Sequence, residues 1–262
     1  MKQRIITAII FGAIFLPVVI YGGMSVIILA YLLGSIALYE VLKMRKLSLF
    51  SIPGLISLLL LWVILLPVQF QDVLETLRFT KIEFVLIAVL LFLTYTVVTK
   101  NRFNFDDVAF SILATLYVGI GFYYFIETRE SGLVYIFYSL FIIWATDSGA
   151  YFIGRAIGKK KLWPEISPNK TIEGSIGGVV CAIIVAILFV VFSDIDATFL
   201  KLSIATIVLS VFGQIGDLVE SALKRHYEVK DSGNILPGHG GILDRFDSLL
   251  FVWPLLHFIN LL

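Results

Sequence analysis

The sequence predicts an all-α membrane protein, a polytopic bundle of transmembrane helices with a cytoplasmic N-terminus. Hydrophobic residues make up 59% of the 262-residue chain, whereas soluble domains are usually about 45–50% apolar. Charged residues make up only 15%, against about 25% in soluble domains. A soluble core of this length could not bury the excess, so much of the surface must face lipid. The single cysteine excludes an intrachain disulfide and a thiolate metal cluster.

About nine hydrophobic runs are long enough to be candidate spans, because a bilayer core needs about 20 apolar residues as helix. The first run resembles a signal peptide but lacks a clear cleavage site, so we expect it to be a retained span. The last run is short, and eight spans with one re-entrant segment is the alternative. The runs cover residues 5–22, 24–42, 52–70, 82–99, 108–126, 133–154, 174–192, 199–220 and 248–262.

The basic residues predict the orientation of these spans. If the N-terminus is cytoplasmic, about 16 of the 20 basic residues, Lys2 and Arg4 among them, fall on the inner side. This distribution follows the positive-inside rule and supports nine spans with the C-terminus outside. We divide the chain into residues 1–130, with about five spans, and residues 131–262, with the remaining spans and the catalytic loops.

The two longest connections, residues 155–173 and 221–247, are both cytoplasmic in this topology. Both are rich in glycine, proline and charge, and long irregular loops in compact proteins are usually functional or disordered. Their specific charge pattern favours function. The sequence therefore predicts a charged pocket near the cytoplasmic face, built from the last third of the chain.

Few acidic residues lie within the hydrophobic runs, where charge is costly and usually functional. Glu40 lies at the inner end of the second run, and we expect it to snorkel or to pair with Lys43. Asp147 lies deep in its run, with Tyr151 and Arg155 at i+4 and i+8 on the same helical face. Asp147 is therefore either functional or half of a structural Asp–Arg pair.

The segment 213–225 carries the strongest charge cluster. Asp217, Glu220 and Lys224 recur at helical spacing, so one face carries two carboxylates and then a cation as the helix leaves the membrane. Gly213 and Gly216 would let another helix or a ligand approach the backbone closely.

The segment 230–248 follows with glycines around His239, which can turn backbone N–H groups toward an anion. Lys230 and Arg245 add cations, and Asp244 and Asp247 face the same way at i and i+3 of a helix beginning near Leu243. Carboxylates that hold a hard cation, beside basic groups, suit metal-bound phosphate. The spacing fits neither a Walker A loop nor a dinucleotide fingerprint.

A second basic stretch precedes the seventh run. We interpret the lysines of 159–161 as topology anchors, whereas the segment 167–174 combines hydroxyls with Lys170 and Glu173 just before a helix N-terminus. That position favours a phosphate or a ribose.

The run Ser221-x-Leu-Lys-Arg225-x4-Lys230-Asp231-x-Gly233-x2-Leu236-Pro-x-His239-Gly-Gly-Ile-x-Asp244-Arg245-Phe-Asp247 resembles the signature of the phosphatidate cytidylyltransferases, also called CDP-diacylglycerol synthases. The match extends position for position over about 27 residues. The stretches 147–151 and 167–174 also resemble this family, except that Asn169 stands where a second lysine is expected. The resemblance covers about the last 120 residues, and the first five spans match only as generic hydrophobic helices.

The resemblance implies a nucleotidyltransferase that converts CTP and phosphatidic acid to CDP-diacylglycerol and pyrophosphate for phospholipid biosynthesis. It implies Mg²⁺ as cofactor, with a second cation open. The expected partners are CTP, phosphatidic acid and the lipid bilayer, with no nucleic acid; a homodimer stays open. We expect a multi-pass protein of the bacterial cell (inner) membrane whose active site faces the cytoplasm.

Residue roles follow from the charge clusters and the resemblance together. We expect the best metal ligands to be Asp217 and Asp244, with Asp147, Glu220 and Asp247 as second-line ligands or orienting groups. The catalytic set comprises Asp217, Asp244, Lys230, Arg245 and His239, and the substrate-binding set comprises Lys224, Arg225, Ser167, Lys170, Thr171, Glu173, Gly240 and Gly241.

Three alternatives explain parts of the pattern. A cation-coupled transporter would use the intramembrane carboxylates as an ion path, but it leaves the glycine–histidine loop unexplained. A polyprenol kinase, or a cytidylyltransferase acting on another lipid, would share the phosphate chemistry. A membrane scaffold would bind no nucleotide.

Overall fold

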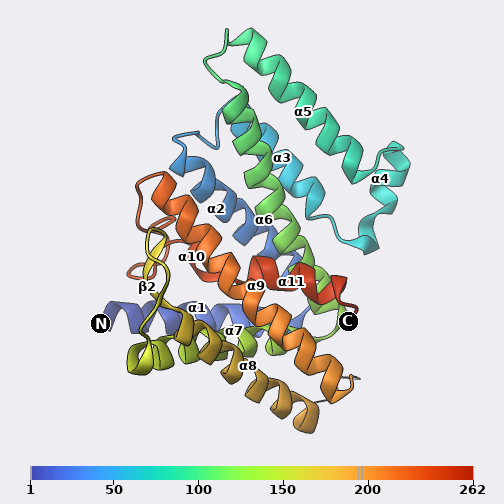
Figure 1. The fold of residues 1–262 in the computed structure, drawn as a ribbon. Helices are drawn as coiled ribbons and strands as arrows, with labels where there is room; N and C mark the ends of the chain where they lie inside the picture. The colour runs from blue at the N-terminus through green and yellow to red at the C-terminus, as the bar shows by residue number, and fades with distance from the viewer. Residues whose placement is uncertain (1, 194, 196, 262) are drawn as a thin grey trace. The chain divides into compact units, whose positions relative to one another are not determined.

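A computed structural model describes residues 2–193, 195 and 197–261 (Figure 1). Most of these residues are helical and very few lie in strands, which confirms the all-α prediction. Leu262, the predicted end of the last run, and the side chains of Lys2 and Arg4 lie outside the described parts. The elements are α1 (Lys2–Tyr21), α2 (Met24–Met44), α3 (Ile52–Ile64), η1 (Val68–Phe70), α4 (Asp72–Leu77), α5 (Lys81–Val98), α6 (Phe105–Ser131), α7 (Leu133–Ile157), β1 (Lys161–Trp163), β2 (Ser167–Thr171), α8 (Ile172–Phe192), α9 (Phe199–His226), α10 (Leu243–Phe246) and α11 (Leu249–Phe258).

The chain forms two compact units. The first contains Met1–Glu127 together with Asp231–Leu243, and the second contains Thr128–Lys230 together with Asp244–Leu262. The glycine-rich loop 231–243 therefore folds with the N-terminal helices, although it is far from them in sequence.

Each predicted hydrophobic run contains one α-helix in its described part, and the run 52–70 also contains the 3-10 helix η1. Within the described residues, six helices, α2 and α5 to α9, are long and apolar enough to cross a membrane, and the apolar parts of α1, α3 and α11 are shorter. The run predicted at 52–70 does not stay helical, because α3 ends at Ile64 and Pro67 restricts the residue before it to extended backbone. Thirteen residues of α3 rise only about 20 Å.

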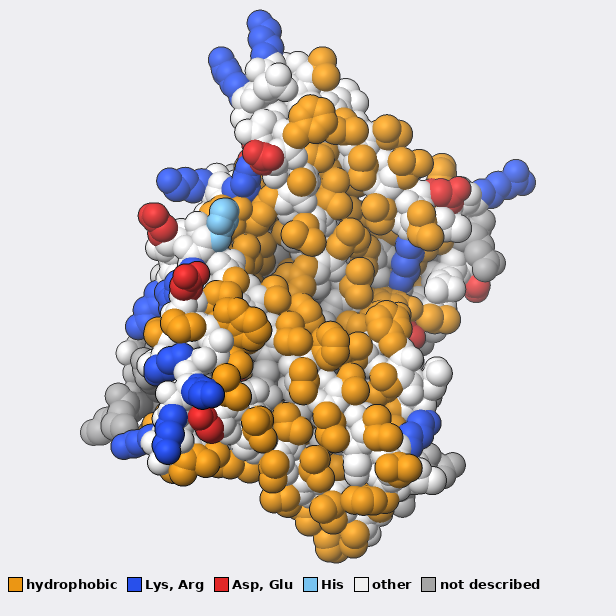
Figure 2. All heavy atoms as spheres, viewed as in Figure 1, with side chains coloured by type: hydrophobic (Ala, Val, Ile, Leu, Met, Phe, Trp, Pro, Cys, Tyr) orange, Lys and Arg blue, Asp and Glu red, His pale blue; other side chains and the backbone are white. Residues whose placement is uncertain are grey.

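Hydrophobic side chains cover much of the surface in Figure 2. In α8, Ile176, Val180, Ile184 and Val191 are all more than half exposed. Only 22% of the apolar window of α8 is buried inside the protein. Exposed apolar area of this extent on a long helix is suited to lipid rather than to water. The described residues therefore have the surface of a membrane protein.

Glycines bring α7 and α8 into close contact (Figure 1). A Cβ atom built on Gly149 would lie 2.6 Å from Cys181 Sγ, and one built on Gly178 would lie 2.6 Å from the backbone oxygen of Thr146. Small residues at such positions let helix backbones approach in a membrane. The hydroxyls of Thr146 and Ser210, 2.8 Å apart, join α7 to α9.

We predict that Gly178→Ala lowers the Tm of the purified protein by several degrees. The added methyl group meets the backbone oxygen of Thr146, which cannot rotate away, and overpacking of this kind usually destabilises by about 1–3 kcal/mol. Thermal unfolding in detergent checks the prediction. Gly12→Ala in α1 is the matched control, because nothing lies within 4 Å of its added Cβ. Equal Tm values for the two variants would contradict this packing.

The segment 155–173 is not the irregular loop predicted from the sequence. Helix α7 continues to Ile157, and β1 and β2 then form an antiparallel hairpin in which Lys161 pairs with Thr171 and Trp163 with Ser167. The side chain of Thr171 caps α8 by accepting a hydrogen bond from the N–H of Gly174 at 3.1 Å. This hairpin places its charged side chains at the end of α7.

Helix α9 extends past the apolar run that ends at residue 220, as the helical spacing of Asp217, Glu220 and Lys224 predicts. It reaches His226, and its last turn carries Lys224, Arg225 and His226. Cations at a helix C-terminus interact favourably with the helix dipole, which explains why the helix continues past the apolar run that ends near residue 220.

Candidate active site

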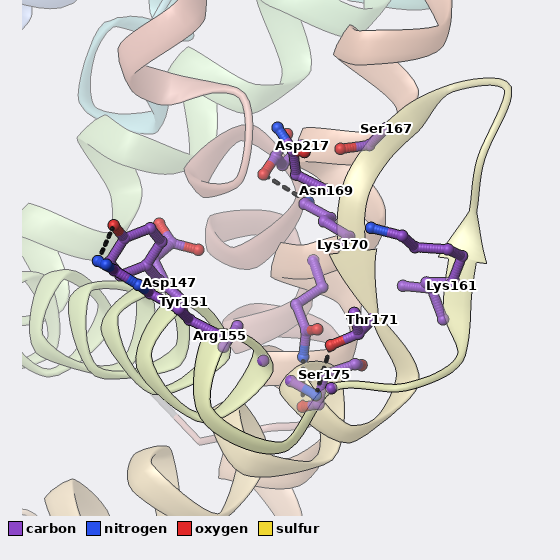
Figure 3. Close-up of a pocket in the computed structure, with 16 residues that line it drawn as sticks. Asp147, Tyr151, Arg155, Lys161, Ser167, Asn169, Lys170, Thr171, Ser175 and Asp217 are labelled. Carbon is purple, nitrogen blue, oxygen red and sulfur yellow. Dashed lines mark hydrogen bonds and ion pairs between the residues drawn. The ribbon is translucent and has the colours of Figure 1, made fainter.

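The second unit contains a pocket of about 580 Å³, a volume typical of small-molecule sites (Figure 3). Helices α7, α8 and α9 and the β1–β2 hairpin line it. The lining residues are Asp147, Ala150, Tyr151, Gly154, Arg155, Gly158, Lys161, Leu162, Ser167, Asn169, Lys170, Thr171, Gly174, Ser175, Gln214 and Asp217.

Helix α7 contributes Asp147, Tyr151 and Arg155, which follow one face of the helix along the pocket. Arg155 Nη1 donates to the Tyr151 hydroxyl at 3.4 Å. Among the described residues, Asp147 forms no ion pair with Arg155. The structural Asp–Arg pair considered for Asp147 is therefore not formed, and both side chains are available to the pocket.

The hairpin contributes the cations. Lys170 Nζ lies 2.5 Å from Asp217 Oδ2, so the lysine of β2 pairs with a carboxylate of α9 across the pocket. Lys161 extends from β1 toward the same space in Figure 3. The sequence interpretation of Lys161 as a topology anchor missed this position, because it treated the three lysines as one charged run. In a strand, alternate side chains point to opposite faces.

Two predicted binding residues of this segment also serve the fold. Thr171 lines the pocket, but its hydroxyl caps α8. The Glu173 carboxylate accepts hydrogen bonds from the backbone N–H groups of Lys159 and Lys160, at 3.1 and 3.2 Å, and holds the turn before β1. Glu173 is not among the lining residues, and its substrate-binding role stays a prediction.

Gln214 is a lining residue that the sequence interpretation did not select. Its side-chain amide donates to the backbone oxygen of Ser175 at 3.4 Å, linking α9 to α8 beside the pocket. A signal was present, because Gln214 is a polar residue in an apolar run and lies three residues before Asp217 on the same helical face.

A second charge cluster joins α9 to α10. Lys224 Nζ forms ion pairs with Glu220 and with Asp244, the latter at 2.6 Å. The side chains of Glu220 and Asp244 are only 1% and 5% exposed, so the lysine shares its charge between two buried carboxylates. Removing one partner of such a group leaves buried charge without compensation. Two predicted metal ligands, Glu220 and Asp244, thus contact Lys224, which was predicted to bind substrate phosphate.

Asp247 lies between α10 and α11, and its carboxyl pKa is raised to about 7. Burial is the largest cause, and the negative charges of Asp217 and Asp147 act in the same direction. The N–H of Ser248 donates to Asp247 Oδ1 at 2.7 Å and partly opposes the shift. Three aspartates from separate parts of the second unit therefore share one region of negative potential.

The chemistry of this donor set fits Mg²⁺, which prefers oxygen ligands. The described residues contain no group of three acidic, histidine or cysteine side chains close enough to hold a metal ion by themselves. Mg²⁺ is usually bound through one or two carboxylates and completed by substrate phosphates and water, so a full protein cage is not required. A bound divalent cation would offset the electrostatic repulsion of Asp247 by Asp217 and Asp147.

We predict that Asp247→Asn flattens the pH dependence of stability in chelator-containing buffer. Between the ordinary pKa of 3.8 and about 7, the folded protein holds a proton on Asp247 that the unfolded chain has released. The stability contributed by this proton is lost as the pH rises through that range. The Tm of the native protein should therefore fall more between pH 5 and pH 8 than that of the variant. Parallel Tm curves would contradict the shift.

The glycine-rich loop belongs to the first unit and is built around a tight turn. The N–H of His239 donates to the backbone oxygen of Leu236 at 2.8 Å, and Gly238 between them has φ 79°, as the third position of a type II turn requires. Leu236 N in turn donates to Gly240 oxygen at 3.0 Å. These groups shape the loop itself, and the phosphate-orienting roles of His239, Gly240 and Gly241 stay predictions.

The remaining predicted cations are exposed: Arg225, Lys230 and Arg245. Arg225 Nε donates to the backbone oxygen of Ile166 at 3.4 Å, next to the hairpin. Their assignment to substrate phosphates stays a prediction.

Comparison with known proteins shows the family of the chain. The family model described as the cytidylyltransferase family matches residues 2–262, and the chain belongs to that family. The chain is similar to the phosphatidate cytidylyltransferase of Bacillus subtilis, with 58% identity over 99% of this chain and 97% of that protein. It is 53% identical to the phosphatidate cytidylyltransferase of Staphylococcus epidermidis and 50% identical to that of Staphylococcus aureus, in each case over 99% of this chain and 98% of the relative.

Proposed function

We propose that this chain is a phosphatidate cytidylyltransferase. It transfers the CMP moiety of CTP to phosphatidic acid and releases pyrophosphate, giving CDP-diacylglycerol for phospholipid biosynthesis. The observation that carries the proposal is the pocket in which Asp217 and Lys170 face each other beside Asp147, in a chain that matches its relatives over its full length. A lipid in the membrane and a soluble triphosphate can meet at such a pocket.

The chain's own residues act by neutralising and aligning two anions. A phosphate oxygen of the lipid attacks the α-phosphorus of CTP, the new P–O bond forms, and the bond to the β-phosphate breaks to release pyrophosphate. Lys161 and Lys170, which line the pocket, are the proposed ligands of the triphosphate. The predicted cations Lys224, Arg225, Lys230 and Arg245 share the remaining phosphate charge. Fixed charges of this kind stabilise the charge of the transition state. The lipid phosphate is already ionised near pH 7, so no general base is required.

Mg²⁺ belongs to the proposal as the cation that accompanies the triphosphate. When bound, it supplies positive charge that polarises the phosphate oxygens. Asp217 and Asp244 are its proposed ligands, with Asp147, Glu220 and Asp247 as second-line ligands or orienting groups, and a second cation stays open. Since Asp217 and Asp244 each pair with a lysine, ligation would release Lys170 and Lys224 toward substrate phosphate.

The proposal also includes the topology. Nine crossings with a cytoplasmic N-terminus place the pocket at the cytoplasmic face of the cell membrane, where CTP is available. The distribution of basic residues supports this orientation. A homodimer is compatible with the proposal but not required by it.

A turnover assay on the purified protein in detergent tests the function. The assay supplies labelled CTP, Mg²⁺ and either phosphatidic acid or a polyprenol, and it follows CDP-lipid and pyrophosphate with and without chelator. Chelator-sensitive formation of CDP-diacylglycerol supports the proposal. Label transfer only to the polyprenol, or substrate flux in proteoliposomes without any product, would favour the kinase or the transporter instead.

A further inference from the structure

Glu40 is a buried carboxylate that the proposed mechanism does not use. It lies near the end of α2 with 0% exposure, so the expectation that it snorkels to the membrane surface is wrong. A carboxylate buried this completely is destabilising unless hydrogen bonds compensate its charge. The hydrogen-bond partners of Glu40 therefore indicate the role of this buried carboxylate.

Three of those partners belong to the glycine-rich loop, about 190 to 200 residues further along the chain. Glu40 Oε1 accepts the N–H of Ile242 at 3.0 Å, and Oε2 accepts the N–H of Leu243 at 2.9 Å. Oε2 also accepts the Ser232 hydroxyl at 3.2 Å. One side chain of α2 thus holds both ends of the segment 231–243, which folds in the same unit. Hydrogen bonds to a charged group are about twice as strong as neutral ones.

The glycines of the loop allow this contact. A Cβ atom built on Gly233 would lie 2.5 Å from Glu40 Oε1, and one built on Gly241 would lie 2.4 Å from the same atom. At both glycines, the Glu40 carboxylate occupies the space that a side chain would need. The loop sequence is therefore shaped to surround Glu40 in addition to any role toward substrate.

We propose that Glu40 is a positioning residue for the reaction. It fixes the backbone of Leu243, the first residue of α10 and the immediate neighbour in sequence of Asp244, the proposed metal ligand. The covalent connection passes this restraint to Asp244 and then to Arg245. Glu40 itself contacts neither substrate nor metal in this mechanism. The inference rests on the proposed function only for the role of Asp244.

Two measurements on Glu40→Gln test the inference. The amide keeps the size of the side chain but loses its charge and turns an NH₂ group toward backbone donors. Hydrogen–deuterium exchange should show faster exchange of the Ile242 and Leu243 amides, and kcat should fall about 30-fold, the loss expected for a charged hydrogen-bond acceptor. The KM for CTP should change less than about threefold, since the pocket of the second unit is unaltered.

Glu130→Gln is the matched control, because it makes the same chemical change at an exposed helical position. Ser232→Ala is the milder variant if Glu40→Gln does not fold, since it removes one of the three hydrogen bonds and should lower kcat by a few fold. Faster loop exchange with an unchanged kcat per folded molecule would overturn the inference, as would unchanged exchange. Absence of turnover in the native protein would instead refute the proposed function. The same assay therefore distinguishes failure of the proposed function from failure of this inference.

Discussion

Asp217→Asn is expected to lower turnover by about 100- to 1000-fold, the loss typical when one group that stabilises transition-state charge is removed. The substitution keeps the shape of the side chain but removes the negative charge that faces Lys170 at 2.5 Å. It therefore removes a proposed Mg²⁺ ligand and leaves the lysine without its carboxylate. Initial rates at saturating CTP and phosphatidic acid measure the effect, and Asp244→Asn should give a loss of the same order.

Asp106→Asn is the control for this pair, because Asp106 is an exposed residue in the first turn of α6. Its turnover should equal that of the native protein. Near-normal turnover of folded Asp217→Asn would remove this carboxylate from the mechanism and leave its ion pair with Lys170 as a structural contact.

The second large effect is on stability, and it concerns Lys224. Lys224→Met keeps the length of the side chain but removes the cation between Glu220 and Asp244, whose side chains are 1% and 5% exposed. Breaking a buried ion pair by removing one partner usually destabilises by about 3–5 kcal/mol. We therefore expect a large fall in Tm in detergent at pH 8.

Two comparisons make the Lys224 prediction specific. Lys170→Met should lower the Tm much less, because Lys170 and Asp217 are 26% and 30% exposed and solvent screens their charges. The double variant Lys224→Met/Glu220→Gln also removes the buried carboxyl group that faces Lys224 and should recover part of the lost Tm. Equal Tm values for Lys224→Met and Lys170→Met would contradict the buried cluster.

The helices could be predicted from the sequence because apolar runs of sufficient length are themselves the physical cause of membrane helices. The hairpin could not, because its strands are short and rich in charge, and a strand such as Ser167–Thr171 gains its order from pairing with Lys161–Trp163. The end of α3 at Ile64 was also missed, since the apolar run continues through Pro67 although the helix does not.

The acidic residues of the site could be predicted because charge in an apolar run, as at Asp147 and Asp217, is rare and informative. Their partners could not, because pairing depends on the fold. Local spacing suggested Arg155 for Asp147 and Lys43 for Glu40. The structure instead pairs Lys170 with Asp217 and surrounds Glu40 with loop residues about 200 positions away.

The central claim is that the pocket of the second unit binds CTP, and the affinity for CTP tests it most directly. Calorimetric titration of the purified native protein should give a measurable Kd in the presence of Mg²⁺. In the double variant Lys161→Met/Lys170→Met, loss of two cations from the pocket should weaken binding at least about tenfold, whereas Lys43→Met on α2 should bind as the native protein does. A double variant that binds CTP with native affinity would contradict the account, because the triphosphate would then be bound elsewhere.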